Sequence, residues 1–220
     1  MLLTIKSAEL ESEVTVTIED ERRELNALLS MLDGEKVSEL ELSDIKGERL
    51  PRALTSVSGL QSLTFRRCHC IQALPQDLRK CAALKSLSFI QCADFYDLRG
   101  ISAFKNLEDL HISGCDCFDT IPDEISQMTH LQALDLSYCT SLGWMELDNL
   151  PRSLRLLDLH GDINAEFDDD AAEQLHLVSV QIQDAVRIPN LNEAPVLKNI
   201  SSLLHKSIEP PSTGSLDGSD

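Results

Sequence analysis

The chain has 220 residues, of which 42% are hydrophobic and only 4% aromatic, so it can bury a sizeable core that aliphatic side chains must fill. Its 37 acidic and 19 basic residues give a net charge of −18, which disfavours nucleic acid and anionic membrane surfaces as partners and favours a protein with a basic patch. No apolar run approaches the ~20 residues of a membrane-spanning helix, and seven cysteines without a secretory signal indicate a reducing compartment, which we expect to be the cytoplasm.

The first 36 residues precede the regular part of the sequence and are expected to form a cap. The segment VTVTI (14–18) has the composition of a β-strand. Asp20 can cap the N-terminus of a helix that Gly34 ends, and the apolar stripe of this helix is Leu25, Leu28, Leu29 and Leu32. We therefore predict a strand–helix cap over residues 1–36 that covers one end of the core that follows.

From Val37 onward, one pattern recurs seven times. Its copies begin at residues 37, 60, 84, 107, 131, 154 and 177 with VSELELSDI, LQSLTFRRC, LKSLSFIQC, LEDLHISGC, LQALDLSYC, LRLLDLHGD and LVSVQIQDA. The starts are 23 or 24 residues apart, and every copy has apolar residues at positions 1, 4 and 6. A single copy cannot bury its apolar face alone, so the copies are expected to stack and share one core.

The pattern L-x-x-L-x-L-x-x-C/N resembles that of leucine-rich repeat proteins, and segments such as IQALPQDL (71–78) and FDTIPDEI (118–125) fit the second half of such repeats. Copies of this length with cysteine at position 9 look most like the cytoplasmic repeats of plant immune receptors and of some pathogen effectors. The resemblance implies an α/β leucine-rich repeat solenoid, a curved horseshoe with a parallel β-sheet on its concave side and short helices or irregular segments on its convex side. It covers residues 37–204 as about seven to eight units, and it is specific for a fold rather than a function.

Cysteine occupies position 9 in four consecutive copies, and we interpret these thiols as a buried structural ladder of Cys68, Cys92, Cys115 and Cys139. The motifs CHC (68–70) and CDC (115–117) also suggest zinc. They lie two copies apart, however, so their cysteines are expected ~10 Å from each other, too far for one tetrahedral ion with bonds of ~2.3 Å. We predict no metal and no cofactor.

The pattern weakens in the sixth copy, where Asp162 stands in place of the ladder cysteine. The segment NAEFDDDAAEQL (164–175) is interpreted as an acidic loop or helix whose aspartates are solvated rather than bound to a cation. LKNISSLL (197–204) is expected to be a last, imperfect strand, and residues 205–220 a disordered acidic tail.

Side chains alternate along a strand, so positions 4 and 6 should point inward and positions 3, 5 and 7 outward. The outward columns contain large residues of the types that anchor protein interfaces, and Trp144, the only tryptophan, is expected at a nearby surface bend as an additional anchor. The predicted partner-binding residues of the concave face are Arg66, Arg67, Ile90, His111, Asp135, Tyr138, Leu156, Asp158 and His160.

The two arginines of this set differ in their expected neighbours. Arg66 has no acidic residue beside it in its own column, where Ser43 and Ile90 flank it. Arg67 can pair laterally with Asp44, which occupies position 8 of the preceding copy. Arg66 is therefore the more attractive candidate anchor for a partner.

His111 and Asp135 should be cross-strand neighbours, and Ser113 lies two residues from His111, so a hydrolase with these three residues is a remote alternative. A nucleophile needs a base within ~3 Å and an oxyanion site, and an open sheet offers no obvious pocket for either. We interpret the pair as a solvated contact that raises the histidine pKa. Phosphate-binding glycine loops, HExxH and nucleophile elbows are absent from the sequence.

The predicted function is therefore non-enzymatic protein–protein interaction through the concave face, as a scaffold, an adaptor or the recognition subunit of a larger assembly. A regulatory or inhibitory subunit that covers a partner enzyme's active site is the alternative. The partner is expected to carry a basic patch.

Overall fold

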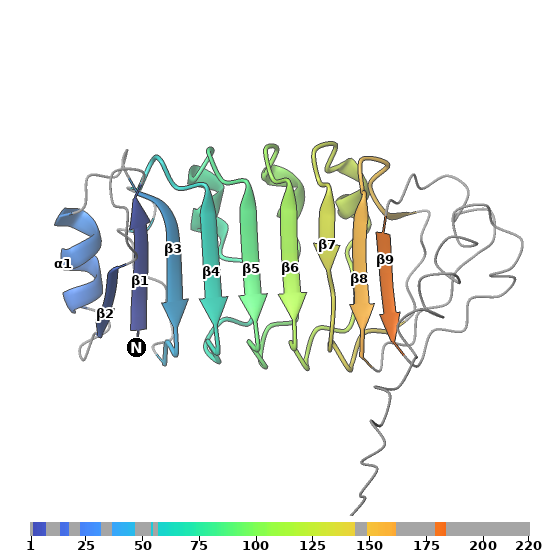
Figure 1. Cartoon of the computed structure of the whole chain (residues 1–220), viewed down its shortest axis with the longest axis horizontal. Helices are drawn as coiled ribbons and strands as arrows, with labels where there is room; N and C mark the ends of the chain where they lie inside the picture. Colours follow the sequence, from blue (N-terminus) through green and yellow to red (C-terminus); the bar gives the residue numbers. More distant parts are fainter. Residues whose placement is uncertain are drawn as a thin grey trace, which may run out of the picture.

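A computed structural model describes residues 2–7, 14–17, 23–31, 37–46, 54, 57–143, 149–161 and 179–183 of the chain. These residues form one nine-stranded sheet in the order β2-β1-β3-β4-β5-β6-β7-β8-β9, with the strands side by side in a single row (Figure 1). Neighbouring strands pair in parallel along the seven repeats: β3 (Val37–Ser43), β4 (Ser62–Arg66), β5 (Ser86–Ile90), β6 (Asp109–Ser113), β7 (Ala133–Asp135), β8 (Leu156–His160) and β9 (Ser179–Gln183).

The strands pair in the register that the repeat alignment predicts. Position 5 of each copy lies opposite position 5 of the next, from Glu41 and Thr64 at one end to Asp158 and Gln181 at the other. The parallel solenoid expected from the sequence is confirmed, whereas the curvature of a horseshoe stays a prediction.

The N-terminal elements extend this sheet before the first repeat. They are β1 (Leu2–Ser7), β2 (Val14–Thr17) and α1 (Arg23–Met31). The sequence predicts β2 and α1 but not β1, which lies between β2 and β3 and is antiparallel to both. Leu3 and Ile5 of β1 are buried, opposite Leu42 and Leu40 of β3, so the core continues into this strand.

The core lies between the sheet and short 3-10 helices on its far side (Figure 1). In β3–β8, every residue at positions 4 and 6 is at most 2% exposed. The helices η2 (Gln76–Lys80), η3 (Ile101–Ala103) and η4 (Asp123–Gln127) each contribute one buried side chain, Leu78, Ile101 and Ile125. Proline directly precedes η2 and η4, where its fixed φ suits the start of a helical turn.

Four phenylalanine rings form a stack inside this core. Ring centroids are 5.3 Å apart for Phe65 and Phe89, 4.1 Å for Phe89 and Phe95, and 5.9 Å for Phe95 and Phe118. Each such aromatic pair adds ~0.5–1.5 kcal/mol beyond the burial of its surface. Although the chain has few aromatic residues, these four join three successive repeats.

The position-9 cysteines form the predicted ladder, and each thiol donates a hydrogen bond to the backbone carbonyl at position 6 of the preceding repeat. The Sγ–O distances are 3.3 Å for Cys68 to Leu42, 3.5 Å for Cys92 to Phe65, 3.4 Å for Cys115 to Phe89 and 2.9 Å for Cys139 to Ile112. All four side chains are fully buried. Burial raises the pKa of Cys115 to about 12 and that of Cys139 to about 11, so these two thiols stay protonated and able to donate.

Neither a zinc cluster nor a membrane span is found in the part of the chain that the structure describes. No three His, Cys, Asp or Glu side chains of these residues are grouped so as to hold a metal ion. Cys117 of the CDC motif is exposed, and Cys70 of the CHC motif is only partly buried. None of the described helices is long and apolar enough to cross a membrane.

Candidate protein-binding face

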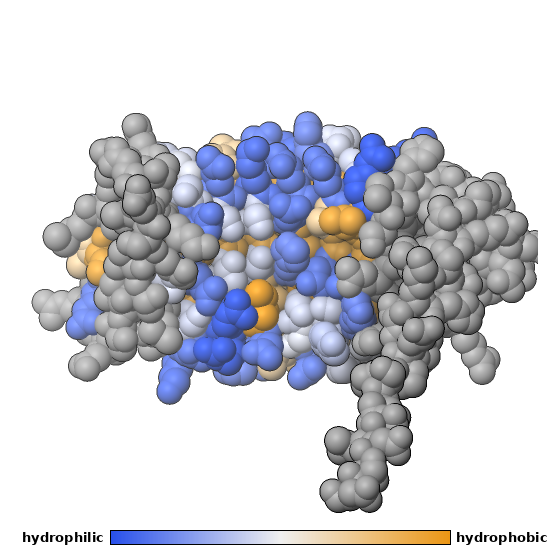
Figure 2. All heavy atoms as spheres, viewed as in Figure 1, coloured by the Kyte–Doolittle hydropathy of each residue, from blue (hydrophilic) through white to orange (hydrophobic). Residues whose placement is uncertain are grey.

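The outward columns form one continuous surface, which we call the open face: the side chains at positions 3, 5 and 7 of β3–β8 together with position 8 at the end of each strand. It lies on the side of the sheet away from the 3-10 helices (Figure 1). Figure 2 shows that this surface is mostly hydrophilic, with hydrophobic side chains reaching it at the lower end of β5 and between β7 and β8. The open face is the surface that the sequence assigns to partner binding.

A left-handed residue follows every strand of the open face, directly after β3–β6 and β8 and three residues after β7. The backbone φ at position 8 is positive in six successive repeats, at Asp44 (58°), Arg67 (51°), Gln91 (54°), Gly114 (63°), Tyr138 (58°) and Gly161 (102°). This conformation disfavours residues with a side chain. It occurs directly before position 9, where the chain turns to point the ladder thiol into the core. Sequence reasoning missed the feature because only two of the six residues are glycine.

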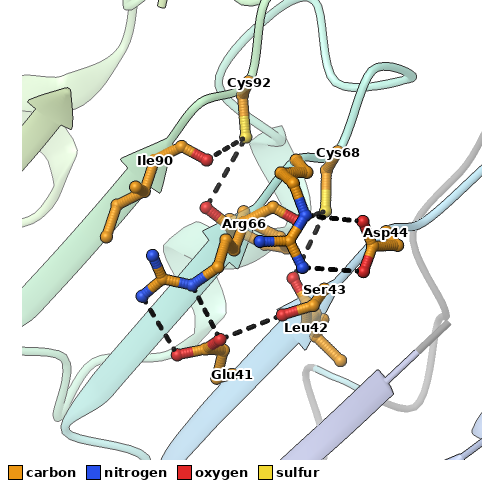
Figure 3. A network of polar contacts seen from close by, with 10 residues as sticks. Glu41, Leu42, Ser43, Asp44, Arg66, Cys68, Ile90 and Cys92 are labelled. Carbon is orange, nitrogen blue, oxygen red and sulfur yellow. Dashed lines mark hydrogen bonds and ion pairs between the residues drawn. The ribbon is translucent and has the colours of Figure 1, made fainter. Parts of the chain in front are cut away.

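Arg66 is not the unpaired anchor that its column indicates. Its guanidinium reaches diagonally to the preceding strand, where Nε lies 2.9 Å from Glu41 Oε1 and Nη2 lies 3.4 Å from Oε2 (Figure 3). The Ser43 hydroxyl also donates to Glu41, at 2.9 Å. Hydrogen bonding from Arg66 holds the pKa of Glu41 below its usual value. The prediction considered only residues at the same position, whereas a long side chain also reaches diagonal neighbours.

The lateral pair of Arg67 and Asp44 is confirmed. Arg67 Nε and Nη2 donate to the two carboxylate oxygens of Asp44, at 2.8 and 2.9 Å. These bonds lower the pKa of Asp44 and raise that of Arg67. Both arginine charges at this end of the open face are therefore already matched by acidic residues of the chain.

His111 and Asp135 make the predicted contact between β6 and β7, with Nδ1 of the imidazole 3.4 Å from Oδ2 of the carboxylate. The hydrogen bond to Asp135 is the main cause of a raised pKa at His111. Burial alone would raise the pKa of Asp135, but hydrogen bonds from His111 and Ser137 outweigh it, and the net shift is downward.

A second histidine–aspartate pair lies on β8 and was not predicted. His160 Nδ1 lies 2.5 Å from Asp158 Oδ1, and the backbone N–H of His160 donates to the same oxygen at 3.0 Å. Asp135 binds the backbone N–H of Ser137 in the same way, at 2.9 Å. In both repeats the aspartate carboxylate accepts from the backbone N–H two residues further along the chain. This spacing is visible in the sequence and could have identified the pair.

The geometry does not support the hydrolase alternative. The Ser113 hydroxyl shares a 2.8 Å hydrogen bond with Ser137 Oγ, whereas the His111 ring contacts Asp135. Among the described residues, Ser113 therefore has a hydroxyl rather than an imidazole as its hydrogen-bond partner, and such a serine is not activated as a nucleophile.

Two of the predicted apolar anchors are well exposed. Tyr138 is 56% exposed and Leu156 48%, and Ile90 is partly buried. Tyr96, which was not predicted, is also 48% exposed, but it lies six residues beyond β5 and outside the open face. Trp144 lies outside the described residues.

The comparisons with known proteins agree with the repeats and the sheet. A family model described as R13L1/DRL21 LRRs matches residues 4–92. The chain has a leucine-rich repeat fold. A search of curated proteins found no match. Leucine-rich repeat domains generally mediate protein–protein interactions through the extended surface of their stacked repeats.

Several solved structures of leucine-rich repeat proteins are similar to the chain. The leucine-rich repeat domain of the type III effector XopL is 18% identical, with a TM-score of 0.46, 65% of this chain and 59% of that chain covered. An internalin from Listeria monocytogenes is 14% identical, with a TM-score of 0.48, and the match covers 71% of this chain and 51% of the internalin. The ectodomain of the receptor kinase SOBIR1 from Arabidopsis thaliana is 17% identical, with a TM-score of 0.34, and the match covers 83% of this chain and 78% of the ectodomain. The chain thus spans little more than half the length of the first two structures.

Proposed function

We propose that this leucine-rich repeat protein is a non-enzymatic recognition module that binds a protein partner through the open face. The observation that carries the proposal is the exposure of Tyr138 and Leu156 on a rigid paired sheet whose other side is filled by the core. An exposed tyrosine on such a surface suits a protein interface, because tyrosine is one of the residue types that contribute most of the binding energy at interfaces, and Leu156 adds exposed apolar area to the same face.

The charge of the open face supports a partner with a basic patch. The two arginines of β4 are paired with Glu41 and Asp44. Over β6–β8 the outward columns contain Asp109, Asp135 and Asp158 and no lysine or arginine. This half of the surface attracts lysine and arginine side chains and repels acidic ones.

As such a module the chain would act as a scaffold, an adaptor or the recognition subunit of a larger assembly. We also propose that it works in a reducing compartment such as the cytoplasm. All seven cysteines are free thiols, and the ladder uses four of them as hydrogen-bond donors. Oxidation of these four would remove the donors, so reducing conditions suit the fold.

A pull-down with matched variants, followed by binding measurements on the purified partner, tests the proposal. The open-face variant carries Ile90→Ala, Tyr138→Ala and Leu156→Ala, and the control variant carries Lys80→Ala and Gln127→Ala on the opposite side. We expect the wild type and the control to retain a common partner that the open-face variant loses. Loss of that partner by the control alone would show that the chain binds through the other side.

A further inference from the structure

The strongest unassigned feature of the molecule is a small surface over β6–β8, bounded by an apolar side chain at each end. Leu156 lies at position 3 of its repeat, as the first residue of β8, and is paired with Ala133 of β7. Tyr138 lies at position 8 of the repeat that contains β7, five residues beyond Ala133. At a rise of at most ~3.3 Å per residue, the two apolar ends are no more than about 16 Å apart along the strand direction. A polypeptide segment in extended conformation covers that distance with about five residues.

The middle of this surface is acidic. Asp135 and Asp158 are direct cross-strand partners at position 5, and both side chains are partly exposed. Like charges opposite each other in a sheet destabilise it. Each aspartate also has a histidine ring nitrogen as a neighbour, at 3.4 Å for Asp135 and 2.5 Å for Asp158. A lysine or arginine from a partner would relieve the repulsion that the two carboxylates exert on each other.

Tyr138 has a conformation that the fold alone does not require of a tyrosine. Its φ of 58° is left-handed, and the repeats on either side place glycine at the same position, Gly114 and Gly161. A side chain at Gly161 would put a Cβ only 3.0 Å from the Cα and Cδ1 atoms of Tyr138, so the absence of that side chain makes room for the ring. Asp44, Arg67 and Gln91 adopt the same conformation in other repeats, so the surrounding fold holds position 8 in it and the tyrosine is tolerated there.

We propose, on the basis of the function proposed above, that the surface over β6–β8 binds an extended segment of a partner protein. The segment has one apolar side chain near each end, for Leu156 and for Tyr138, and a lysine or arginine between them for Asp135 and Asp158. Arginine or lysine also stacks well on a tyrosine ring, which favours a basic residue close to the Tyr138 end.

The probe for this proposal is a phage-displayed library of random seven-residue peptides, selected on the purified full-length chain. We expect the enriched peptides to contain lysine or arginine with an apolar residue on each side. One enriched peptide is then made synthetically, labelled, and its Kd measured by fluorescence polarisation. Tyr138→Ala and the double change Asp135→Asn with Asp158→Asn should each raise the Kd about ten-fold or more. Tyr96→Ala, which removes another well-exposed tyrosine outside the open face, should leave the Kd within about two-fold.

Each other outcome decides against the proposal in a defined way. Enrichment of acidic peptides, or of no peptide at all, overturns it. Binding that depends on Ile90 but not on Tyr138, Asp135 or Asp158 overturns it and leaves the open face as the binding surface. Binding that is lost only with Lys80→Ala and Gln127→Ala overturns both this inference and the proposed function.

Discussion

The cysteine at position 9 is a residue whose role the sequence predicts well, because its recurrence at one position of a repeat indicates a structural part rather than a reactive thiol. The structure adds the acceptor, the position-6 carbonyl of the preceding repeat. A buried thiol that donates such a bond has no need of a low pKa, and burial raises the pKa of Cys115 to about 12.

The change Cys115→Ala should therefore lower the free energy of unfolding by about 1–2 kcal/mol, from lost packing and the lost bond to Phe89. Urea unfolding followed by circular dichroism measures the loss. Cys117→Ala is the matched control, since Cys117 is exposed in the same repeat and should change little. A thiol reagent should label Cys117 but not Cys115 in the folded protein, and rapid labelling of both would contradict the buried ladder.

His111 shows how the sequence predicts a contact without predicting all that surrounds it. The register of the repeats places it beside Asp135, and the structure confirms the contact. The diagonal pair of Arg66 and Glu41, the His160–Asp158 pair and the left-handed conformation at position 8 were not predicted. These features depend on side-chain reach and local backbone turns, which no fixed residue type marks in every repeat.

The pKa of His111 is raised mainly by its hydrogen bond to Asp135 and should return toward its ordinary value of ~6.5 in Asp135→Asn. A raised folded-state pKa stabilises the fold fully below the unfolded pKa, and this contribution is lost as the pH rises through the folded pKa. The difference in unfolding free energy between wild type and Asp135→Asn should therefore shrink as the pH rises from the unfolded-state pKa of His111 through its folded-state pKa. NMR titration of the His111 ring protons measures the pKa directly, and identical curves for the two proteins would rule out Asp135 as the cause.

At the scale of the elements, the repeat strands could be predicted with their register, because the period of the apolar pattern fixes both. The strand β1 could not, since LLTIKS (2–7) has no copy elsewhere in the chain and its apolar stretch is short. Only tertiary pairing with β3 determines that it is a strand. Its place between β2 and β3 explains how a segment outside the repeats extends their core.

Deleting residues 1–36 should expose the edge of β3, with its unpaired backbone groups, and the apolar side chains that β1 and α1 cover. Leu40 and Leu42 lie opposite Ile5 and Leu3, and Leu29 of α1 is buried. We expect the truncated protein to aggregate or to melt at a lower temperature.

Size-exclusion chromatography and thermal melting by circular dichroism test this expectation. A chain without residues 209–220 is the control and should melt like the full-length protein. A truncated chain that stays monomeric with an unchanged melting temperature would mean that residues 1–36 are not a stabilising cap.

For the whole molecule, the net charge of −18 and the aspartates of β6–β8 both attract a basic segment of a partner. Long-range attraction of a basic segment raises its association rate more than it slows dissociation, and salt screens it over a Debye length of ~10 Å at 0.1 M. The sequence predicts this charge and the fold that presents it. It does not predict which carboxylates remain available, because Glu41 and Asp44 become engaged with arginines only in the folded sheet.

Association of the selected peptide should therefore slow as the salt concentration rises from about 0.05 M to about 0.5 M, while its dissociation rate changes little. Stopped-flow fluorescence at several salt concentrations measures both rates. A peptide with glutamine in place of its basic residues is the control and should associate slowly at every concentration. An association rate of the basic peptide that does not depend on salt would show that charge does not steer this interaction.

The cysteine ladder also gives the array a direction. One carbonyl acceptor of each ladder thiol lies in the repeat before it, as for Cys68 with Leu42 and Cys139 with Ile112. A chain made from its N-terminus therefore presents each new donor to an acceptor that has already been synthesised. No thiol of the ladder needs a later repeat to complete this bond.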